Sequence, residues 1–389
     1  DIQNAVELTQ KVFGQPRLPV VPLFENKTAL SNAKTILQNF LSIPQNRQIV
    51  SKYWGGKMEV MVGYSDSAKE NGTLASRSLI DQALQDMEKT ILKHQLKPIF
   101  FHGSGGSVAR GGGSVEEQTS WWPQSAKRHF KSTVQGEMIQ RSFARPEIFR
   151  RQVEQIAERS QKNRRARPTK GQRLALKALV DDSQKAYRSQ LENPVFLQVV
   201  EAATPYTYLQ HLKIGSRPAK RKKQLSIDSL RAIPWVLCWT QNRTLFPSWW
   251  GIGSSWRQRS QAEKEELLKL YKKSAFLRSY VKLLGFTLAK VELNVFRYYL
   301  SQSHLSSQIQ ERVFREFQVE YKNAVECVRA LSQEQSLLWY RPWLEKSIQL
   351  RSPMIHPLNV LQQIALREND LILLRESVTG IACGMMTKG

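Results

Sequence analysis

Four short apolar segments stand out along this chain, and each is followed at once by polar or charged residues. They cover residues 18–24, 60–63, 99–101 and 233–239. Two longer segments, 28–41 and 74–96, repeat apolar residues at helical spacing and separate the first three. Short buried strands that alternate with helices are typical of a parallel α/β arrangement. We therefore expect strands at the four apolar segments.

The residues that follow three of these segments carry chemistry. Glu25, Asp66 and His102 come at or just after the ends of the first three apolar segments. In a closed α/β barrel the functional side chains lie at the carboxyl ends of the strands. The pattern therefore predicts a helix-rich α/β protein that contains part of a TIM-like β/α barrel with many additional helices.

The chain beyond about residue 140 is mostly helical in its pattern. Residues 260–263 (SQAE) have the form of a capping box, and residues 286–300 and 307–331 have amphipathic spacing. Residues 353–361, which include two prolines, are expected to interrupt the pattern before a last helix at 362–374.

A glycine-rich segment at residues 101–114 follows the third apolar segment. It holds six glycines together with His102 and Arg110. Such a loop can bring its backbone N–H groups close to a ligand, and with a histidine and an arginine it suits an anion. The alternative is a flexible linker, although linkers rarely carry His and Arg within the glycine run.

The composition limits the classes of function. The formal charge is +25, with basic runs at 162–173 and 220–223, which suits either nucleic acid or a small anionic substrate. No aromatic residues interleave the basic runs, so we do not expect nucleic acid as the main partner. The sequence has no run of eighteen apolar residues, so no membrane span is expected, and no signal peptide is recognised. Three distant cysteines favour a reducing compartment.

Several residues are candidates for binding a metal and a phosphate. Glu25 and Asp66 offer hard oxygen ligands for Mg²⁺ or Mn²⁺, and Lys69 follows Asp66 by three residues. The Ser-Asp-Ser sequence around Asp66 could instead cap a helix. Arginine is the residue that most often binds carboxylate and phosphate groups through paired hydrogen bonds. Candidates for this role are Arg217, Arg231 and possibly Arg243, although each could instead be a solvated surface residue.

These motifs resemble the C-terminal part of phosphoenolpyruvate carboxylase. The matching words occur in the family's order and run through nearly the whole chain. They include VVPLFEN (20–26), VGYSDSAKENG (62–72), FHGSGGSVARGGG (101–113), IGSRPAKRK (214–222), LRAIPWVLCWTQNR (230–243) and PLNVLQ (357–362).

The resemblance implies a cytoplasmic carboxy-lyase that joins bicarbonate to phosphoenolpyruvate and gives oxaloacetate and phosphate. Because oxaloacetate is an intermediate of the tricarboxylic acid cycle, the implied role is anaplerotic carbon fixation. Glu25 and Asp66 match the family's Mg²⁺ or Mn²⁺ ligands. Lys69 matches a lysine of the bicarbonate and phosphate region, and His102 matches the histidine of the mobile glycine-rich loop. The remaining catalytic matches are the arginines that hold phosphate and carboxylate, Arg217 and Arg231, and the loop arginine, Arg110.

The resemblance also implies allosteric inhibition by aspartate or malate, and a homotetramer. The inhibitor ligands would correspond to Arg110, Lys290, Arg351 and Thr387. It further implies three regions: barrel strands with the metal site and loop at 1–145, a helical segment with a barrel strand and the phosphate-binding arginines at 146–255, and a helical region with the inhibitor site at 256–389.

The chain departs from the family at three points. Ser104 stands where the family's loop has a catalytic arginine, and Thr387 stands where the inhibitor site has an asparagine. The family's N-terminal half, with its Thr-Ala-His-Pro-Thr motif, has no counterpart in this sequence. The chain is therefore expected to be a C-terminal piece of a longer enzyme, or to need a partner chain that carries the other half. A non-catalytic relative that binds metal and phosphoenolpyruvate as a scaffold or regulatory protein is the alternative hypothesis.

Overall fold

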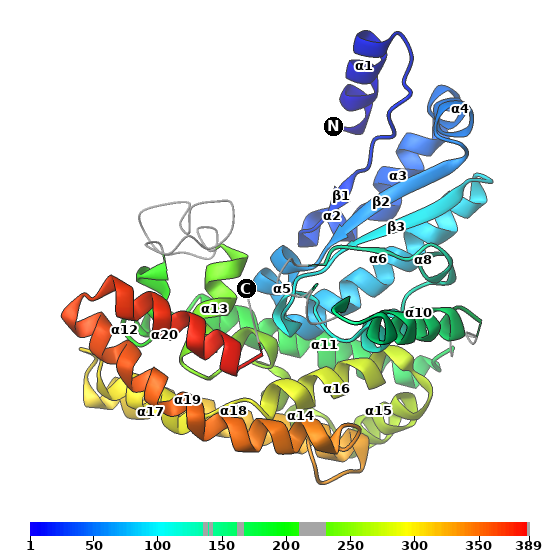
Figure 1. Ribbon diagram of the computed structural model, residues 1–389. Coiled ribbons are helices and arrows are strands. Elements are labelled where there is room, and N and C mark those ends of the chain that lie inside the picture. Colours follow the sequence, from blue (N-terminus) through cyan, green and yellow to red (C-terminus); the bar gives the residue numbers. More distant parts are fainter. Residues whose placement is uncertain (135–138, 140–142, 162–166, 210–230, 387–389) are drawn as a thin grey trace. The chain divides into compact units, whose positions relative to one another are not determined.

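The computed structural model describes residues 1–134, 139, 143–161, 167–209 and 231–386 (Figure 1). The chain divides into two compact units. The first comprises Asp1–Ser67, Ser76–Gly105 and Gly113–Arg165, and the second comprises Ala68–Ala75, Gly106–Gly112 and Ala166–Gly389.

The first unit is built on a four-stranded parallel sheet. Its strands are β1 (Leu23–Phe24), β2 (Lys57–Gly63), β3 (Lys97–Gly103) and β4 (Lys131–Ser132), and neighbours in the sheet follow the order β1-β2-β3-β4. Because the strands are parallel, each connection must cross back over the sheet, and helices make the first two crossovers. The prediction of a helix-rich parallel α/β protein is thereby confirmed.

The helices of the first unit bury apolar faces at helical spacing. Leu37 and Leu41 are buried in α3, and Leu84, Met87 and Ile91 are buried in α6. The helices are α1 (Ile2–Phe13), α2 (Lys27–Ser31), α3 (Ala33–Ser42), α4 (Pro44–Tyr53), α5 (Ser65–Asn71), α6 (Thr73–Lys93), α7 (Val115–Thr119), α8 (Gln124–Arg128) and α10 (Pro146–Gln161).

The second unit consists of helices in the part of the chain that the structure describes. Three short 3₁₀ segments join them: η1 (Val108–Arg110), η2 (Pro205–Thr207) and η5 (Phe246–Ser248). The helices are α11 (Lys170–Leu191), α12 (Pro194–Ala202), α13 (Ala232–Gln241), α14 (Ile252–Gln258), α15 (Gln261–Lys273), α16 (Ala275–Leu288), α17 (Leu293–Ser301), α18 (Ser307–Ser332), α19 (Pro342–Glu368) and α20 (Leu371–Gly384).

The strand prediction at residues 233–239 was wrong, because this segment is the helix α13. A continuous apolar run of seven residues does not distinguish a fully buried strand from a fully buried helix. All eight residues from Pro234 to Gln241 are buried, so no polar face shows the helical period. Pro234 lies in the first turn of the helix, where a missing N–H group costs little.

The predicted interruption at residues 353–361 was also wrong, since α19 runs through both Pro353 and Pro357. Close packing against α20 accounts for the continuity. A Cβ atom on Gly380 would lie 2.9 Å from a methyl group of Leu358, and one on Gly384 would lie 2.7 Å from Ile355. The absent glycine side chains let the two helices approach closely, and this contact opposes the local cost of the prolines.

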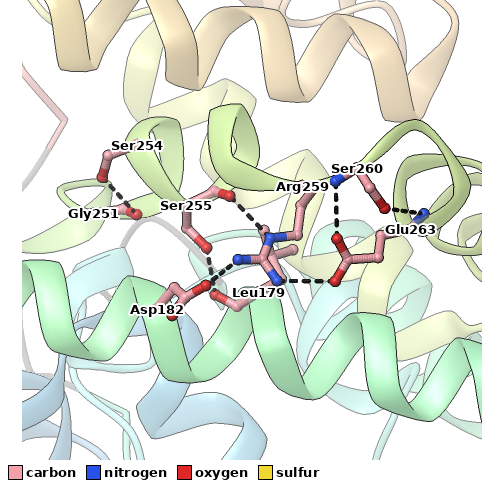
Figure 2. Close-up of polar contacts among 8 residues, drawn as sticks. All are labelled: Leu179, Asp182, Gly251, Ser254, Ser255, Arg259, Ser260 and Glu263. Carbon is pink, nitrogen blue, oxygen red and sulfur yellow. Dashed lines mark hydrogen bonds and ion pairs between the residues drawn. The ribbon is translucent and has the colours of Figure 1, made fainter.

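Buried polar and aromatic side chains join the helices of the second unit. Figure 2 shows Arg259 at the end of α14, where its guanidinium pairs with Asp182 of α11 and with Glu263 of α15. Glu263 also completes the predicted capping box with Ser260, which is confirmed. The core contains a cluster of aromatic rings: Phe196, Trp235, Trp239, Phe246, Trp249, Trp250 and Phe317.

The carboxylate of Glu320 anchors the beginning of α14 to α18. It accepts hydrogen bonds from the backbone N–H groups of Gly251 at 2.9 Å, Gly253 at 2.7 Å and Ser254 at 2.8 Å. A Cβ atom on Gly253 would lie only 2.4 Å from the carbonyl oxygen of Glu320. The two helix backbones therefore touch at a place where only glycine fits.

Candidate functional site

The carboxyl ends of three strands bring predicted site residues to one edge of the sheet. Phe24 of β1 pairs in register with Val62 of β2, and Val62 pairs with His102 of β3. Glu25, Gly63 and Gly103 therefore come next to one another at the end of the ladder. A Cβ atom on Gly63 would lie 2.5 Å from Cβ of Glu25, so glycine is needed there to leave room for the glutamate.

Asp66 belongs to the same edge of the sheet. It lies in the first turn of α5, and the backbone N–H of the next residue, Ser67, donates a 3.0 Å hydrogen bond to the carbonyl oxygen of Glu25. This bond ties the start of α5 to the end of β1. The chain thus holds both carboxylate-bearing residues on adjoining segments of one unit.

The donor set at this edge fits Mg²⁺ or Mn²⁺. These ions are commonly held by one or two carboxylates and complete their shell with water and substrate oxygens. Among the described residues, no three His, Cys, Asp or Glu side chains gather in a way that could hold a metal. A metal at this edge would take Glu25 and Asp66 as ligands and complete its shell with water and substrate oxygens.

His102 is fully buried at the end of β3. Its Nδ1 atom lies 2.9 Å from the hydroxyl of Tyr64, and its ring stacks on Trp122 with centroids 3.4 Å apart and planes within 4°. Its Nε2 atom has no hydrogen-bond partner among the residues that the structure describes. Burial lowers the pKa of His102 to about 3, so the imidazole is neutral at physiological pH.

Ser104 follows His102 by two residues and is also buried. Its carbonyl oxygen accepts a 2.7 Å hydrogen bond from the hydroxyl of Thr133, and its own hydroxyl lies 3.4 Å from that of Ser132. The side chain at this position is therefore packed beside two other hydroxyl groups near β4. It offers no positive charge to an anion.

The other predicted cationic residues have different surroundings. Lys69 is buried one helical turn after Asp66 in α5, and Arg110 is buried at the end of η1. Arg231 precedes α13, and its buried Nε atom has no hydrogen-bond partner within the described part of the chain. Arg217 lies outside the described residues, as does Thr387.

A pocket in the second unit brings together Lys290 and Arg351, two of the four residues predicted for an inhibitor site. Arg110 does not line it. The cavity has about 220 Å³ of space and opens to solvent. Besides the two predicted residues its wall contains Arg243, Ser352, Ile348, Ile355, Gly384, Met385 and Met386.

The pocket is electropositive and partly apolar. Lys290 is buried, with its ammonium 4.1 Å from the ring centre of Phe286. Burial and the nearby charge of Arg243 lower the pKa of Lys290 to about 7. The guanidinium of Arg351 donates a 2.8 Å hydrogen bond to Ser347 and is half-buried.

Two features beside the predicted residues were not anticipated. Tyr64 and Trp122 enclose His102, and Arg243 joins the pocket of Lys290 and Arg351. Tyr64 belongs to the GYSDS motif that contains Asp66. Trp122 belongs to a Trp-Trp pair soon after the glycine-rich segment, so both aromatic residues lie close in sequence to predicted site residues. Nothing in the sequence pattern predicts that Arg243, at the end of a buried apolar run, meets α19 and α20.

Comparison with known proteins assigns the class. The family model for phosphoenolpyruvate carboxylase matches residues 2–372, so the chain belongs to the phosphoenolpyruvate carboxylase family. Phosphoenolpyruvate carboxylase from Shewanella halifaxensis is 34% identical over 410 residues, which cover 99% of this chain and 45% of that protein.

Two further relatives come from distant organisms. The phosphoenolpyruvate carboxylase of Acinetobacter baumannii is 33% identical over 99% of this chain and 45% of its own length, and phosphoenolpyruvate carboxylase 4 of Arabidopsis thaliana is 34% identical over 99% of the chain and 40% of its length. The chain thus spans less than half the length of the curated relatives it matches. None of its described helices has the length and apolar character that crossing a bilayer requires.

Proposed function

We propose that this chain is the C-terminal, active-site half of an enzyme that carboxylates phosphoenolpyruvate with bicarbonate, giving oxaloacetate and phosphate. The observation that supports this most strongly is the meeting of Glu25, Asp66 and the end of β3 at one edge of a parallel sheet, in a chain of the carboxylase family. Carboxyl ends of parallel strands are where such sheets carry their active sites.

The proposed reaction has three steps. A bicarbonate oxygen attacks phosphorus and the bond from phosphorus to the enol oxygen breaks, which gives carboxyphosphate and the enolate of pyruvate. Carboxyphosphate then breaks the bond between its carbon and the bridging oxygen, which gives carbon dioxide and phosphate, and the proton that came with bicarbonate stays on phosphate. The enolate carbon finally bonds to carbon dioxide. A divalent ion held by Glu25 and Asp66 would supply charge neutralisation for the enolate and phosphoryl oxygens.

The protein's own part is mainly positioning and electrostatic stabilisation, as phosphoryl transfer requires. Lys69, Arg217 and Arg231 would hold the phosphate and carboxylate groups. With a pKa of about 3, His102 is neutral and a weak base, so it suits a neutral hydrogen-bond contact to carboxyphosphate or carbon dioxide rather than the acceptance of a proton.

A second polypeptide segment would complete the catalytic unit as a TIM-like barrel. The two edge strands, β1 and β4, are each only two residues long, and an edge strand presents unpaired backbone groups. In α1 the apolar side chains of Leu8, Val12 and Phe13 are between half and two-thirds exposed. The family's N-terminal half would cover such surfaces, and a homotetramer of the complete enzyme stays a prediction.

The pocket of Lys290 and Arg351 is the proposed site for an inhibitory dicarboxylate such as aspartate or malate. A small anion is favoured there because cations line a partly apolar wall, where charge interactions are stronger than in water. If the same ligand also captured Arg110, it would draw the glycine-rich loop away from the active site.

Binding of malate to this pocket is expected to weaken as pH rises above 7. Lys290 has its pKa lowered to about 7, so it is charged below that pH and neutral above it. Arg243 and Arg351 also line the pocket, and Glu292 reaches it through Ser352. Both malate carboxylates are ionised at these pH values. The malate dissociation constant, measured by calorimetry from pH 6.5 to 8.5, should increase by up to about tenfold per pH unit above 7.

The variant Lys290→Arg is the control for this pH dependence. An arginine stays charged throughout the range, so its affinity for malate should change little with pH. A wild-type affinity that is flat from pH 6.5 to 8.5 would contradict the role given to Lys290.

A second function is favoured by the surroundings of Ser104. The family's loop arginine is replaced by a neutral, buried hydroxyl next to Ser132 and Thr133. Loss of one preorganised donor to a developing charge costs on the order of 10²- to 10³-fold in rate in studied enzymes. A non-catalytic relative that binds phosphoenolpyruvate and metal is therefore the competing proposal.

The test uses the longest natural polypeptide that contains this chain. It is incubated with phosphoenolpyruvate, bicarbonate and Mg²⁺, and oxaloacetate and phosphate are quantified separately, with the double variant Glu25→Ala, Asp66→Ala as background. Equal amounts of both products mean a working carboxylase. Excess phosphate means that carbon dioxide capture fails. A folded sample that binds phosphoenolpyruvate but forms neither product supports the non-catalytic function.

A further inference from the structure

Aromatic side chains hold the imidazole of His102 in one orientation. The hydroxyl of Tyr64 lies 2.9 Å from Nδ1, and the indole of Trp122 lies flat against one face of the ring, with the two planes within 4°. Trp122 itself stacks on Phe130, with ring centres 5.7 Å apart. A hydrogen bond at one ring nitrogen and a stacked partner on one face oppose rotation of the ring. The second ring nitrogen, Nε2, therefore has a fixed direction, away from Tyr64.

The hydroxyl of Tyr64 donates its proton to His102. Tyr64 is buried, and burial raises the pKa of its hydroxyl, so the phenol keeps its proton at neutral pH. Within the described part of the chain, Nδ1 of His102 is the acceptor that this O–H group reaches. The neighbouring indole of Trp122 carries a donor and no acceptor. A buried O–H group without an acceptor is costly, so Nδ1 has to be the unprotonated nitrogen.

This hydrogen bond fixes the tautomer of His102. A neutral imidazole carries one proton, and when Nδ1 accepts a hydrogen bond the proton is on Nε2. The opposite tautomer would leave both the O–H group of Tyr64 and the lone pair of Nε2 without partners. Nε2 is buried and has no partner among the described residues. His102 thus presents a buried N–H donor, and such a donor indicates an acceptor that a ligand supplies.

The donor belongs to the edge of the sheet that carries the proposed metal ligands. His102 is the last residue but one of β3, and the next residue, Gly103, pairs in register with Gly63. Gly63 lies against Glu25, and Tyr64 comes two residues before Asp66. The hydrogen bond between Tyr64 and His102 therefore joins the ends of β2 and β3, where the carboxylates of the proposed site begin.

We propose that Tyr64 is a positioning residue that fixes His102 as its Nε2–H tautomer, so that the imidazole donates a hydrogen bond to an anionic oxygen of carboxyphosphate. Trp122 holds the plane of the ring and does not choose the tautomer. No proton leaves His102 in this role. The inference rests on the proposed carboxylation and adds to it the residue that makes His102 a donor.

The first test reads the tautomer directly by NMR of the full chain labelled with ¹⁵N at histidine, with the His102 signals identified by their loss in His102→Gln. At pH 7 His102 should show a proton on Nε2 and an Nδ1 signal typical of a nitrogen that accepts a hydrogen bond. Tyr64→Phe removes only the hydroxyl. It should shift the Nδ1 signal to that of a free acceptor and make the Nδ1–H form detectable.

Two variants serve as controls. Tyr53→Phe removes the hydroxyl of a tyrosine that precedes β2, at the other end of that strand, and should leave the His102 signals in place. Trp122→Phe keeps a flat ring beside the imidazole and should preserve the Nε2–H form. Nδ1–H as the main form in the unmodified chain, or identical His102 signals in the unmodified chain and Tyr64→Phe, would overturn the inference.

The second test uses phosphonoacetate, a stable analogue of carboxyphosphate in which a CH₂ group replaces the bridging oxygen. Adding it with Mg²⁺ should shift the Nε2–H signal of His102, whereas chloride at equal ionic strength should not. Calorimetry should show phosphonoacetate binding that is weaker by about 2- to 10-fold in Tyr64→Phe, the effect of one hydrogen bond. Phosphonoacetate that binds without moving the Nε2–H signal refutes the donor role.

These outcomes are distinguishable from failure of the proposed function, since no turnover is measured. A chain that forms oxaloacetate with His102 in the Nδ1–H form would refute the role of Tyr64 and leave the carboxylation in place. A chain that forms no product but shows the Nε2–H signature and its response to phosphonoacetate would support the role of Tyr64 in a binding protein. Absence of any phosphonoacetate binding refutes the donor role together with the proposed anion site.

Discussion

Glu320→Ala is expected to lower the free energy of unfolding of this protein by more than about 3 kcal/mol, because it leaves three backbone N–H donors without an acceptor at about 1–3 kcal/mol each. The carboxylate of Glu320 receives hydrogen bonds from Gly251, Gly253 and Ser254 at the start of α14. Burial raises the pKa of Glu320, and these three hydrogen bonds oppose that shift. Urea unfolding monitored by tryptophan fluorescence measures the effect.

Two further variants make this measurement specific. Glu320→Gln keeps an oxygen for some of the donors but directs an amide N–H₂ group at another, so its loss of stability should be smaller than that of Glu320→Ala. Glu311→Ala removes an exposed ion pair with Arg297 from the same helix, and its effect should be small. Equal stability of Glu320→Ala and Glu311→Ala would show that the carboxylate does not anchor α14.

The second large effect is expected at the proposed metal site. The double variant Glu25→Ala, Asp66→Ala should lower the Mg²⁺-dependent component of phosphoenolpyruvate binding by more than about 100-fold, because changing residues that merely support metal ligands already costs 10- to 100-fold. Calorimetric titration of phosphoenolpyruvate with and without Mg²⁺ measures this component directly.

The close contact of Gly63 with Glu25 offers a more subtle variant. Gly63→Ala keeps both carboxylates but places a methyl group 2.5 Å from Cβ of Glu25, so it should displace the glutamate and weaken the same Mg²⁺-dependent binding. Glu59→Gln, on the same strand but paired with Lys131, is the matched control and should bind as the wild type does. If the double variant binds phosphoenolpyruvate with unchanged Mg²⁺ dependence, Glu25 and Asp66 are not the metal ligands.

Much of the parallel sheet could be predicted from local pattern. The segments at 60–63 and 99–101 lie within β2 and β3, and Glu25 and Asp66 follow strands as expected. His102 lies within β3, as its last residue but one. The segment at 18–24 forms a strand only at Leu23–Phe24, and β4 was not predicted. Two-residue strands carry too little pattern to be seen, because they exist only through pairing with a neighbour.

Two helices of the second unit were harder to predict. α13 has no polar face, so its period is hidden, and α19 tolerates Pro353 and Pro357 because α20 packs tightly against it. Buried polar side chains occupy another motif of the sequence. Asn359 and Gln362 of PLNVLQ donate hydrogen bonds to Gln241 at 2.7 Å, which joins α19 to α13.

By itself, the sequence determined the family, the parallel α/β class and the identity of the candidate residues, because motif spacing and strand ends are local properties of the chain. The tertiary structure alone decided that His102 is enclosed by Tyr64 and Trp122, and that Arg243 reaches the pocket of Lys290 and Arg351. These contacts join residues tens to more than a hundred positions apart. The charge state of a buried imidazole or ammonium depends on such neighbours and on exclusion from water, which no local pattern encodes.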